Sequence, residues 1–248
     1  MTVRKVARTT VAVLLLATTA CGGSKTTEKK ITPDQIQLLA TAFFNNYQGK
    51  GAEFQLTTLD RPGGRTITMA GQIDFEEHRG GATVAGGAGS FPVTEVYWAN
   101  NQVLERRPNL DVVLGEKGIA PGSYLLRGAD TQHRRLDMLI KILTGLALKV
   151  PENAQLIRQK EGTAFLRDDT LRNTKVEVLR YGQNVILWVD PESGNLLRFE
   201  GRNAAGTLPV IVDIIELKKF DLQGPTVQQV VDTTKWTDEY NSYAPESP

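Results

Sequence analysis

Short stretches in which apolar and polar residues alternate constrain the fold of this chain most strongly. The clearest is residues 66–76, where every second position is apolar or glycine and most positions between them are polar. The shared face carries Ile67, Met69, Gly71, Ile73 and Phe75. Strict alternation is typical of a β-strand with one buried and one solvated face, as antiparallel sheets have. The pattern therefore predicts a sheet that covers a core with one side.

The same kind of pattern predicts strands along most of the chain. They fall at residues 53–58, 93–98, 103–106, 163–167, 175–181, 185–189, 196–202 and 209–217. Asn100-Asn101 favours a tight hairpin turn, and residues 181–183 and 190–194 favour turns between later strands. Residues 108–128 are interrupted by Gly and Pro, and we expect them to form loops with a short helix.

One helix is predicted near the start of the chain. Thr32 is its expected N-cap, Pro33 takes the first helical position, and Gln35 lies three residues after the cap. Apolar residues then keep a helical spacing as far as Tyr47, and Gly49 is expected to end the helix.

A second helix is predicted at about residues 131–148, with Asp130 or Thr131 as its cap. Besides one apolar stripe it carries apolar groups on other faces, at Met138 and Ile142. A surface helix keeps one polar side. Two interpretations stay open: this is a buried core helix, or it lines a space that an apolar ligand occupies. The strand at 209–217 is likewise apolar on both faces.

The order of helix, strands, helical insertion and strands predicts an α+β domain with a large, curved, mostly antiparallel sheet and helices on one side. The chain has 248 residues, of which 40% are hydrophobic, and this suits one globular domain with a sizeable core. We expect that domain at residues 32–239, followed by a polar tail at 240–248.

The N-terminus has the order of a secretory signal. Basic residues precede an apolar stretch at 11–17, and small residues follow it before Cys21. The apolar stretch is too short to cross a hydrocarbon core of about 30 Å as a helix. Residues 1–20 are therefore predicted to be a signal that is removed after export.

Cys21 is the only cysteine of the chain, so it has no disulfide partner. Residues 18–22 resemble the lipobox of bacterial lipoprotein signals, in which small residues precede a cysteine followed by Gly or Ser, although Leu is commoner than Thr at position 18. The resemblance implies a diacylglyceryl thioether on Cys21 and a lipid-anchored location on the extracytoplasmic face of the cell membrane. Residues 21–31 are then expected to be a lipidated, flexible tether.

Composition and motifs exclude several functional classes. Without Arg4, Lys5 and Arg8, 26 basic residues face 28 acidic ones, so the exported chain has no basic footprint of a nucleic-acid binder. The two histidines, His78 and His133, have the positions of surface residues. The chain has no metal-ligand spacing, phosphate-binding loop or G-x-S-x-G motif, so we expect no metal, no cofactor and no enzymatic activity.

Several motifs resemble the LppX/LprG-type lipoproteins of actinobacteria, which are similar in fold to the lipoprotein carriers LolA and LolB. Besides the lipobox, they are a strand pair within 72–84, a hairpin at 96–104 and the segment 186–198, which contains Trp-Val-Asp-Pro at 188–191. A long closing strand and Phe220-Asp221 follow. The resemblance implies an incomplete β-barrel, in which helices close a strongly bent antiparallel sheet.

The resemblance also implies a function. Such a domain binds acyl chains of lipids or glycolipids in its concavity and helps to move them across the envelope. The candidate wall residues are Met69, Ile73, Leu136, Leu139, Ile140 and Leu143. A non-enzymatic envelope sensor, which holds a protein partner on the same scaffold, is the alternative. It predicts a filled core and an exposed patch or groove.

Overall fold

The computed structural model describes residues 30–86, 92–202, 208–226 and 230–233. The predicted signal at 1–20, the predicted attachment site Cys21, nearly all of the predicted tether at 21–31 and the predicted tail at 240–248 lie outside the described residues.

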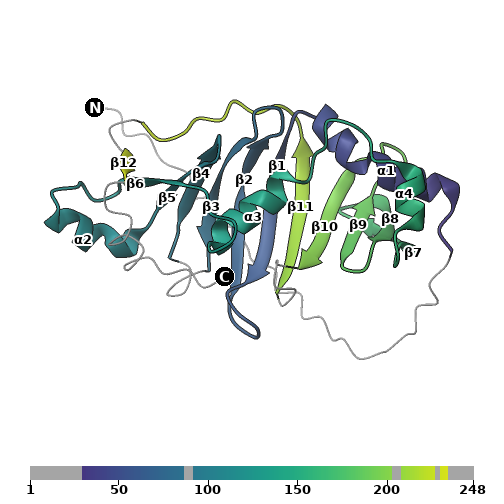
Figure 1. Cartoon of the computed structure of the whole chain (residues 1–248), viewed down its shortest axis with the longest axis horizontal. Helices are drawn as coiled ribbons and strands as arrows, with labels where there is room; N and C mark the ends of the chain where they lie inside the picture. Colours follow the sequence, from purple (N-terminus) through teal and green to yellow (C-terminus); the bar gives the residue numbers. More distant parts are fainter. Residues whose placement is uncertain (1–29, 87–91, 203–207, 227–229, 234–248) are drawn as a thin grey trace, which may run out of the picture.

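One curved sheet dominates the described part of the chain (Figure 1). Its twelve strands follow the order β12-β6-β5-β4-β3-β2-β1-β11-β10-β9-β8-β7. Neighbouring strands run antiparallel except β12, which is parallel to β6. The sheet does not close, so the predicted class of an α+β domain with a curved, incomplete antiparallel barrel is confirmed.

The strand bounds agree with the predicted pattern over most of the sheet. They are β1 Gly51–Leu59, β2 Thr66–Asp74, β3 Arg79–Ala85, β4 Glu95–Ala99, β5 Gln102–Arg106, β6 Tyr124–Gly128, β7 Ala164–Leu171, β8 Thr174–Tyr181, β9 Val185–Val189, β10 Leu196–Arg202, β11 Pro209–Leu217 and β12 Val230–Asp232. The turn at Asn100-Asn101 has both residues at positive φ, +48° and +62°, as a tight hairpin turn requires.

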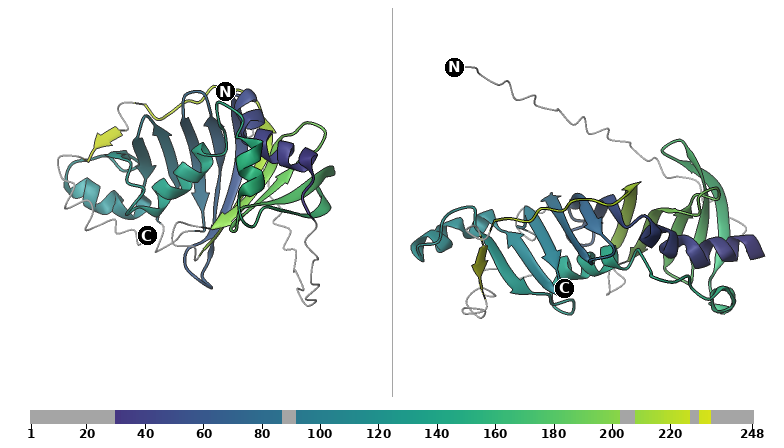
Figure 2. Two further views of the ribbon diagram at one scale, coloured as in Figure 1. Left: turned by 45° about the vertical axis from the view of Figure 1, so that its right-hand side comes forward. Right: turned by 90° about the horizontal axis from the view of Figure 1, so that it is seen from above.

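Alternation along the strands divides the sheet into two faces. On β2, Met69 is buried, whereas the next residue, Ala70, is exposed. We call the side that bears Met69 and Val212 the covered face, because α1 (Pro33–Gln48), α3 (Arg135–Thr144) and α4 (Ala154–Gln159) lie on it (Figure 2). The opposite side, which bears Ala70, is the open face.

The first helix forms as the sequence predicts. Thr32 Oγ1 accepts a hydrogen bond from the Gln35 backbone N–H (3.2 Å), and Gln35 Oε1 accepts one from the Thr32 N–H (3.0 Å). This capping box satisfies two amide donors that have no partner inside the helix. The helix ends at Gly49 and buries one apolar stripe, including the fully buried Leu39, against the sheet.

The second predicted helix is shorter than expected at both ends. Asp130 Oδ1 accepts from the N–H groups of Gln132 and His133 (3.1 Å each), so it holds a turn and caps no helix. The N-cap of α3 is Arg134, in extended conformation and without a side-chain hydrogen bond to the helix, and Gly145 ends the helix. The prediction of Asp130 or Thr131 as cap, and of helix over 131–148, was therefore wrong in its bounds.

Residues 108–128 contain more regular structure than predicted. A 3-10 turn (Pro108–Leu110) and α2 (Asp111–Glu116) supply the expected short helix, but residues 124–128 form β6 and pair with β5. Leu110 and Leu114 pack on Leu125 of this strand as a small separate core. The second apolar face of β11 is partly covered: Ile215 is 45% exposed, whereas Leu217 packs against the main core.

Candidate functional site

The space between α3 and the sheet is where the sequence places a ligand. Five of the six candidate wall residues, Met69, Ile73, Leu136, Leu139 and Leu143, are at most 1% exposed and belong to the main core. They pack against strands and helices and do not line the pocket beside α3. Along this part of the interface the helix and sheet are in close contact.

Ile140 is the candidate that reaches a hollow. It lines a pocket of about 410 Å³ beside α3, which we call the α3 pocket. Its apolar walls come from the β4–β5 hairpin, the segment after β6 and the helix itself: Trp98, Ala99, Val103, Ala129 and Ile140. The volume lies within the range of small-molecule sites, roughly 300–1,000 Å³.

The mouth of the α3 pocket is polar. Its rim consists of the exposed residues His78, Asn101, Thr131 and Lys141, together with the partly buried Thr144. His78 and Asn101 belong to turns at the ends of strands and have positive φ, +51° and +62°. An apolar wall with a polar rim that includes the Lys141 cation is suited to an amphipathic ligand with an anionic or polar head.

One wall of the pocket depends on a glycine. A Cβ placed on Gly80 of β3 would collide with the six-membered part of the Trp98 ring, so the indole lies against bare backbone. Trp98 is 4% exposed, and its ring also contacts Phe54 with centroids 6.4 Å apart. The position of this wall is therefore fixed by the pairing of β3 with β4.

A buried cluster of charges closes the base of the pocket. Asp137 of α3 is 1% exposed and accepts two hydrogen bonds from the Arg127 guanidinium of β6, at 2.7 and 2.8 Å. Arg127 also donates to both carboxylate oxygens of Glu105 on β5, at 3.2 Å each, and Arg107 donates to the same two oxygens at 2.9 and 3.2 Å. The start of α3 is thus held on the sheet by a buried ionic network.

Two members of the network, Glu105 and Arg127, have shifted pKa values that favour their charged forms. Burial acts to raise the pKa of Glu105, but the positive charges of Arg127 and Arg107 and their hydrogen bonds outweigh burial, so the pKa lies below its ordinary value. Burial acts to lower the pKa of Arg127, but the charges of Glu105 and Asp137 raise it overall. Glu105 is thus held in its charged form between the two arginines.

Among the other hollows on the described part of the molecule, two lie near elements that border the proposed sites. One, of about 410 Å³, lies on the open face over β1–β4, where Ala70, Gly81 and Tyr97 meet Leu222 and Gln223 of the segment after β11. The other, of about 540 Å³, lies between the start of α1 and α4, with Lys30, Ile36 and Arg158 among its lining residues.

Both histidines, His78 and His133, lie on the surface, as predicted. His133 is exposed and pairs with Asp130 (Nδ1–Oδ2 3.0 Å) in the turn before α3. Within the described residues, no group of three or more His, Cys, Asp and Glu side chains is placed to hold a metal ion. In the same residues, every helix is too short or too polar to cross a membrane.

Sequence reasoning missed the Glu105–Arg127–Asp137 network because charged residues in unassigned or loop segments are expected to be solvated. Arg127 lies in the region predicted as loops, and Asp137 lies on a helix that shows an apolar stripe. A signal was present in Tyr124-Leu125-Leu126, whose apolar run before Arg127 favours a strand. Such a strand places Arg127 beside β5, opposite Val103.

Comparisons with known proteins give remote structural likenesses only. No family model and no curated protein sequence matches the chain. An uncharacterized conserved protein from Thermus thermophilus is similar over 76% of this chain and 94% of its own, with 11% identity and a TM-score of 0.40. MucB in the Pseudomonas aeruginosa MucA/MucB complex covers 80% of this chain and 62% of its own, with 13% identity and a TM-score of 0.34.

A third similar structure is the hypothetical lipoprotein YmcC from Escherichia coli. The likeness spans 78% of this chain and 99% of YmcC, with 14% identity and a TM-score of 0.23. At these values the three structures are distant likenesses of the chain.

Proposed function

We propose that this protein is an extracytoplasmic lipoprotein, anchored through Cys21, which binds the acyl chain of a lipid or glycolipid in the α3 pocket and helps to move it across the envelope. The observation that carries the proposal is the form of the pocket: walls from Trp98, Val103 and Ile140 below a rim that includes Lys141. An acyl chain fits the walls, and a polar or anionic head fits the rim.

The energetics favour an acyl chain over a small polar solute. Removal of apolar surface from water contributes about 25 cal/mol per Å², or roughly 0.8 kcal/mol for each methylene. Micromolar affinity corresponds to about 8 kcal/mol. A few methylenes against the Trp98 and Ile140 side chains supply less than this. The acyl chain must therefore also extend beyond the pocket, or the lipid head must contact the rim. The polar rim beside Lys141 is thus part of the proposed site.

The test is the lipid content of protein that has been purified without detergent. Non-denaturing mass spectrometry should show a bound species with the mass of a lipid. Ala129→Phe places a ring in the α3 pocket and should lower occupancy roughly tenfold, the equivalent of about 60 Å² of lost apolar contact. Ala70→Phe is the matched control, because Ala70 lies in the open-face groove on the other side of the sheet. Equal occupancy in both variants, or no bound lipid in the unmodified protein, contradicts the proposal.

A second function is favoured by the filled core. Five of the six predicted wall residues are in close contact with the core, and the open face carries its own groove beside Tyr97 and Leu222. These are the features that a protein-binding envelope module requires. The same two variants test this function. It is supported if the protein captures one protein partner, if Ala70→Phe abolishes the capture and if Ala129→Phe leaves it unaffected.

A further inference from the structure

The end of the molecule at which the described chain begins carries an uncovered mixture of apolar and basic side chains. Leu156 of α4 is 65% exposed and Val150, just before α4, is 69% exposed. Lys30, Lys149 and Arg158 are exposed around them. We call this group, together with Lys160, the α4 surface.

From this arrangement we infer that the α4 surface docks on the anionic lipid headgroups of a membrane. Exposed leucine and valine among lysines and arginines are the residues that hold a protein at a lipid interface: the apolar groups enter the headgroup boundary and the cations meet the negative lipids.

The local charge is favourable although the whole exported chain is slightly acidic. Four cations, Lys30, Lys149, Arg158 and Lys160, lie here, and within the part of the chain that the structure describes none of them forms an ion pair with a carboxylate. Lys160 lies over the ring of Tyr181, 3.7 Å from its centroid. The acidic neighbours are Asp34, Glu161 and Glu152, and Glu152 accepts a hydrogen bond from the Tyr181 hydroxyl (2.6 Å).

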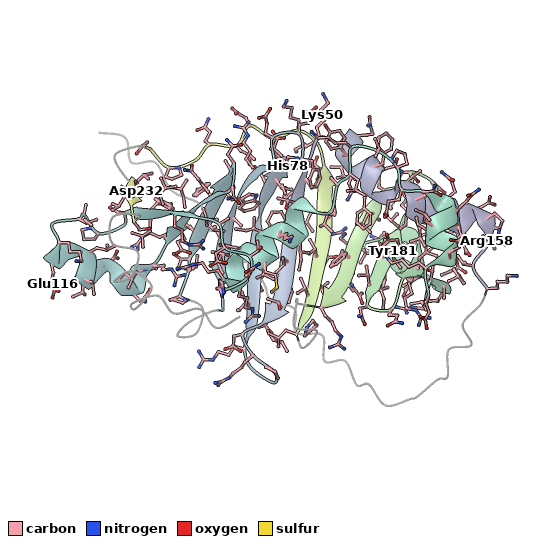
Figure 3. The ribbon with its side chains drawn as sticks, in the orientation of Figure 1. Lys50, His78, Glu116, Arg158, Tyr181 and Asp232 are labelled. Carbon is pink, nitrogen blue, oxygen red and sulfur yellow. The ribbon has the colours of Figure 1, made fainter. Side chains whose placement is uncertain are left out.

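The position of the surface agrees with the path of the chain. Lys30 and Ile31 line the hollow of about 540 Å³ between α1 and α4, on whose other side lie Ala154 and Arg158. Figure 3 labels Arg158 at the end of the molecule where α1 begins. The hollow has Ile31 and Ile36 in its wall and basic residues at its edge, so it offers room for a lipid headgroup beside the apolar contacts.

The distance to the proposed anchor is short. Lys30 follows Cys21 by nine residues, so an acylated Cys21 lies within about 30 Å of the α4 surface even if the intervening chain is fully extended. The inference rests on the proposed function only for this anchor. The charge and exposure of the α4 surface are independent of whether the α3 pocket holds a lipid.

Site-specific quenching by brominated lipids tests the inference. The full-length protein, purified from membranes in the form in which cells hold it, is reconstituted in phosphatidylcholine vesicles with and without phosphatidylglycerol. Leu156→Trp reports on the α4 surface, read as the difference in quenching from the unmodified protein, whose own tryptophans include Trp98 of the α3 pocket. Val112→Trp is the matched control, because Val112 is 75% exposed on α2, which lies at the other end of the molecule (Figure 1). Both positions are on the surface, and circular dichroism checks that each variant is folded.

The expected result is fractional quenching at position 156 roughly threefold or more above that at position 112 in vesicles with phosphatidylglycerol. Arg158→Glu combined with Lys160→Glu should lower the signal at position 156 by about half or more, as should removal of phosphatidylglycerol. Equal quenching at the two positions overturns the inference. A blue shift of the Leu156→Trp emission that depends on protein concentration without lipid also overturns it, because it assigns the surface to a second copy. Loss of lipid from the α3 pocket in the Ala129→Phe variant should leave the signal unchanged.

Discussion

The helices α1 and α3 cover the same face of the sheet, but they are held there in different ways. Each buries a leucine completely in the main core, Leu39 in α1 and Leu139 in α3. The start of α1 is fixed by its own residues, Thr32 and Gln35. The start of α3 has no side-chain cap and is fixed from outside, by hydrogen bonds from Arg127 of β6 to Asp137.

The two helix starts are therefore stabilised by different kinds of interaction. A capping box works inside one segment and satisfies helix-end donors at the surface. The network below α3 joins β5, β6 and the helix, and its charges are out of water. Desolvation of such charges is costly, so the network stabilises the fold only while every partner is present. It also fixes the base of the α3 pocket, which the capping box of α1 does not touch.

The largest expected effect comes from breaking the network. Asp137→Ala leaves the buried Arg127 with Glu105 as its remaining carboxylate partner among the described residues and should lower the free energy of unfolding by about 3–5 kcal/mol. Asp34→Ala is the matched change in the first turn of α1, where the carboxylate is exposed, and should cost no more than about 1 kcal/mol. Urea denaturation measures both. Similar losses in the two variants would show that α3 is not held by the network.

Truncation of a core leucine should destabilise the protein to a similar extent in α1 and in α3. Leu139→Ala and Leu39→Ala each delete a side chain with no exposed surface, and each should lower the free energy of unfolding by about 2–5 kcal/mol. Chemical denaturation of both variants provides the measurement. A loss in only one of them would mean that the two helices do not share one core.

Acid should weaken the network below α3. The pKa of Glu105 is lowered in the folded state, so its contribution to stability is fully present above its ordinary value near 4.5 and is lost as the pH falls through the folded pKa. Denaturation midpoints measured between pH 7 and pH 3 should fall more steeply for the unmodified protein than for Glu105→Gln, which cannot titrate. Parallel curves for the two proteins are the contrary result.

The smallest effect is that of the cap. Thr32→Ala removes the oxygen that accepts from Gln35 and should cost about 1 kcal/mol. Thr131 is a predicted cap of α3, but it lies in an exposed turn. Thr131→Ala should therefore lower the free energy of unfolding by less than about 0.5 kcal/mol. Thermal unfolding of both variants compares them, and a larger loss at Thr131 would restore it as a cap.

Local sequence was a good guide wherever the pattern was complete within one segment. The predicted strands at 196–202 and 209–217 coincide with β10 and β11, and Thr32 and Gln35 form the predicted capping box. At the site, Ile140 is the predicted wall residue that reaches the pocket. Met69 and Leu139 share its apolar character, but periodicity gives no measure of whether opposing side chains touch or leave space.

Two elements required information from elsewhere in the fold. Residues 124–128 form β6 where β5 offers a paired edge and Glu105 offers a partner for the buried Arg127. The helix α3 begins at Arg135, later than predicted, because Asp130 bonds to the amides of the preceding turn and Asp137 is drawn to Arg127.

Local sequence specified the antiparallel strands, the start of α1 and the apolar stripe of α3, because alternation, capping and helical spacing are properties of neighbouring residues. Contacts between distant segments set the rest: most of the α3 stripe is packed solid, the α3 pocket lies beside Ile140, and the buried Arg127 holds the helix through Asp137. The reason is physical: the cost of burying a charge, and the space left between two surfaces, depend on partners that lie far away along the chain.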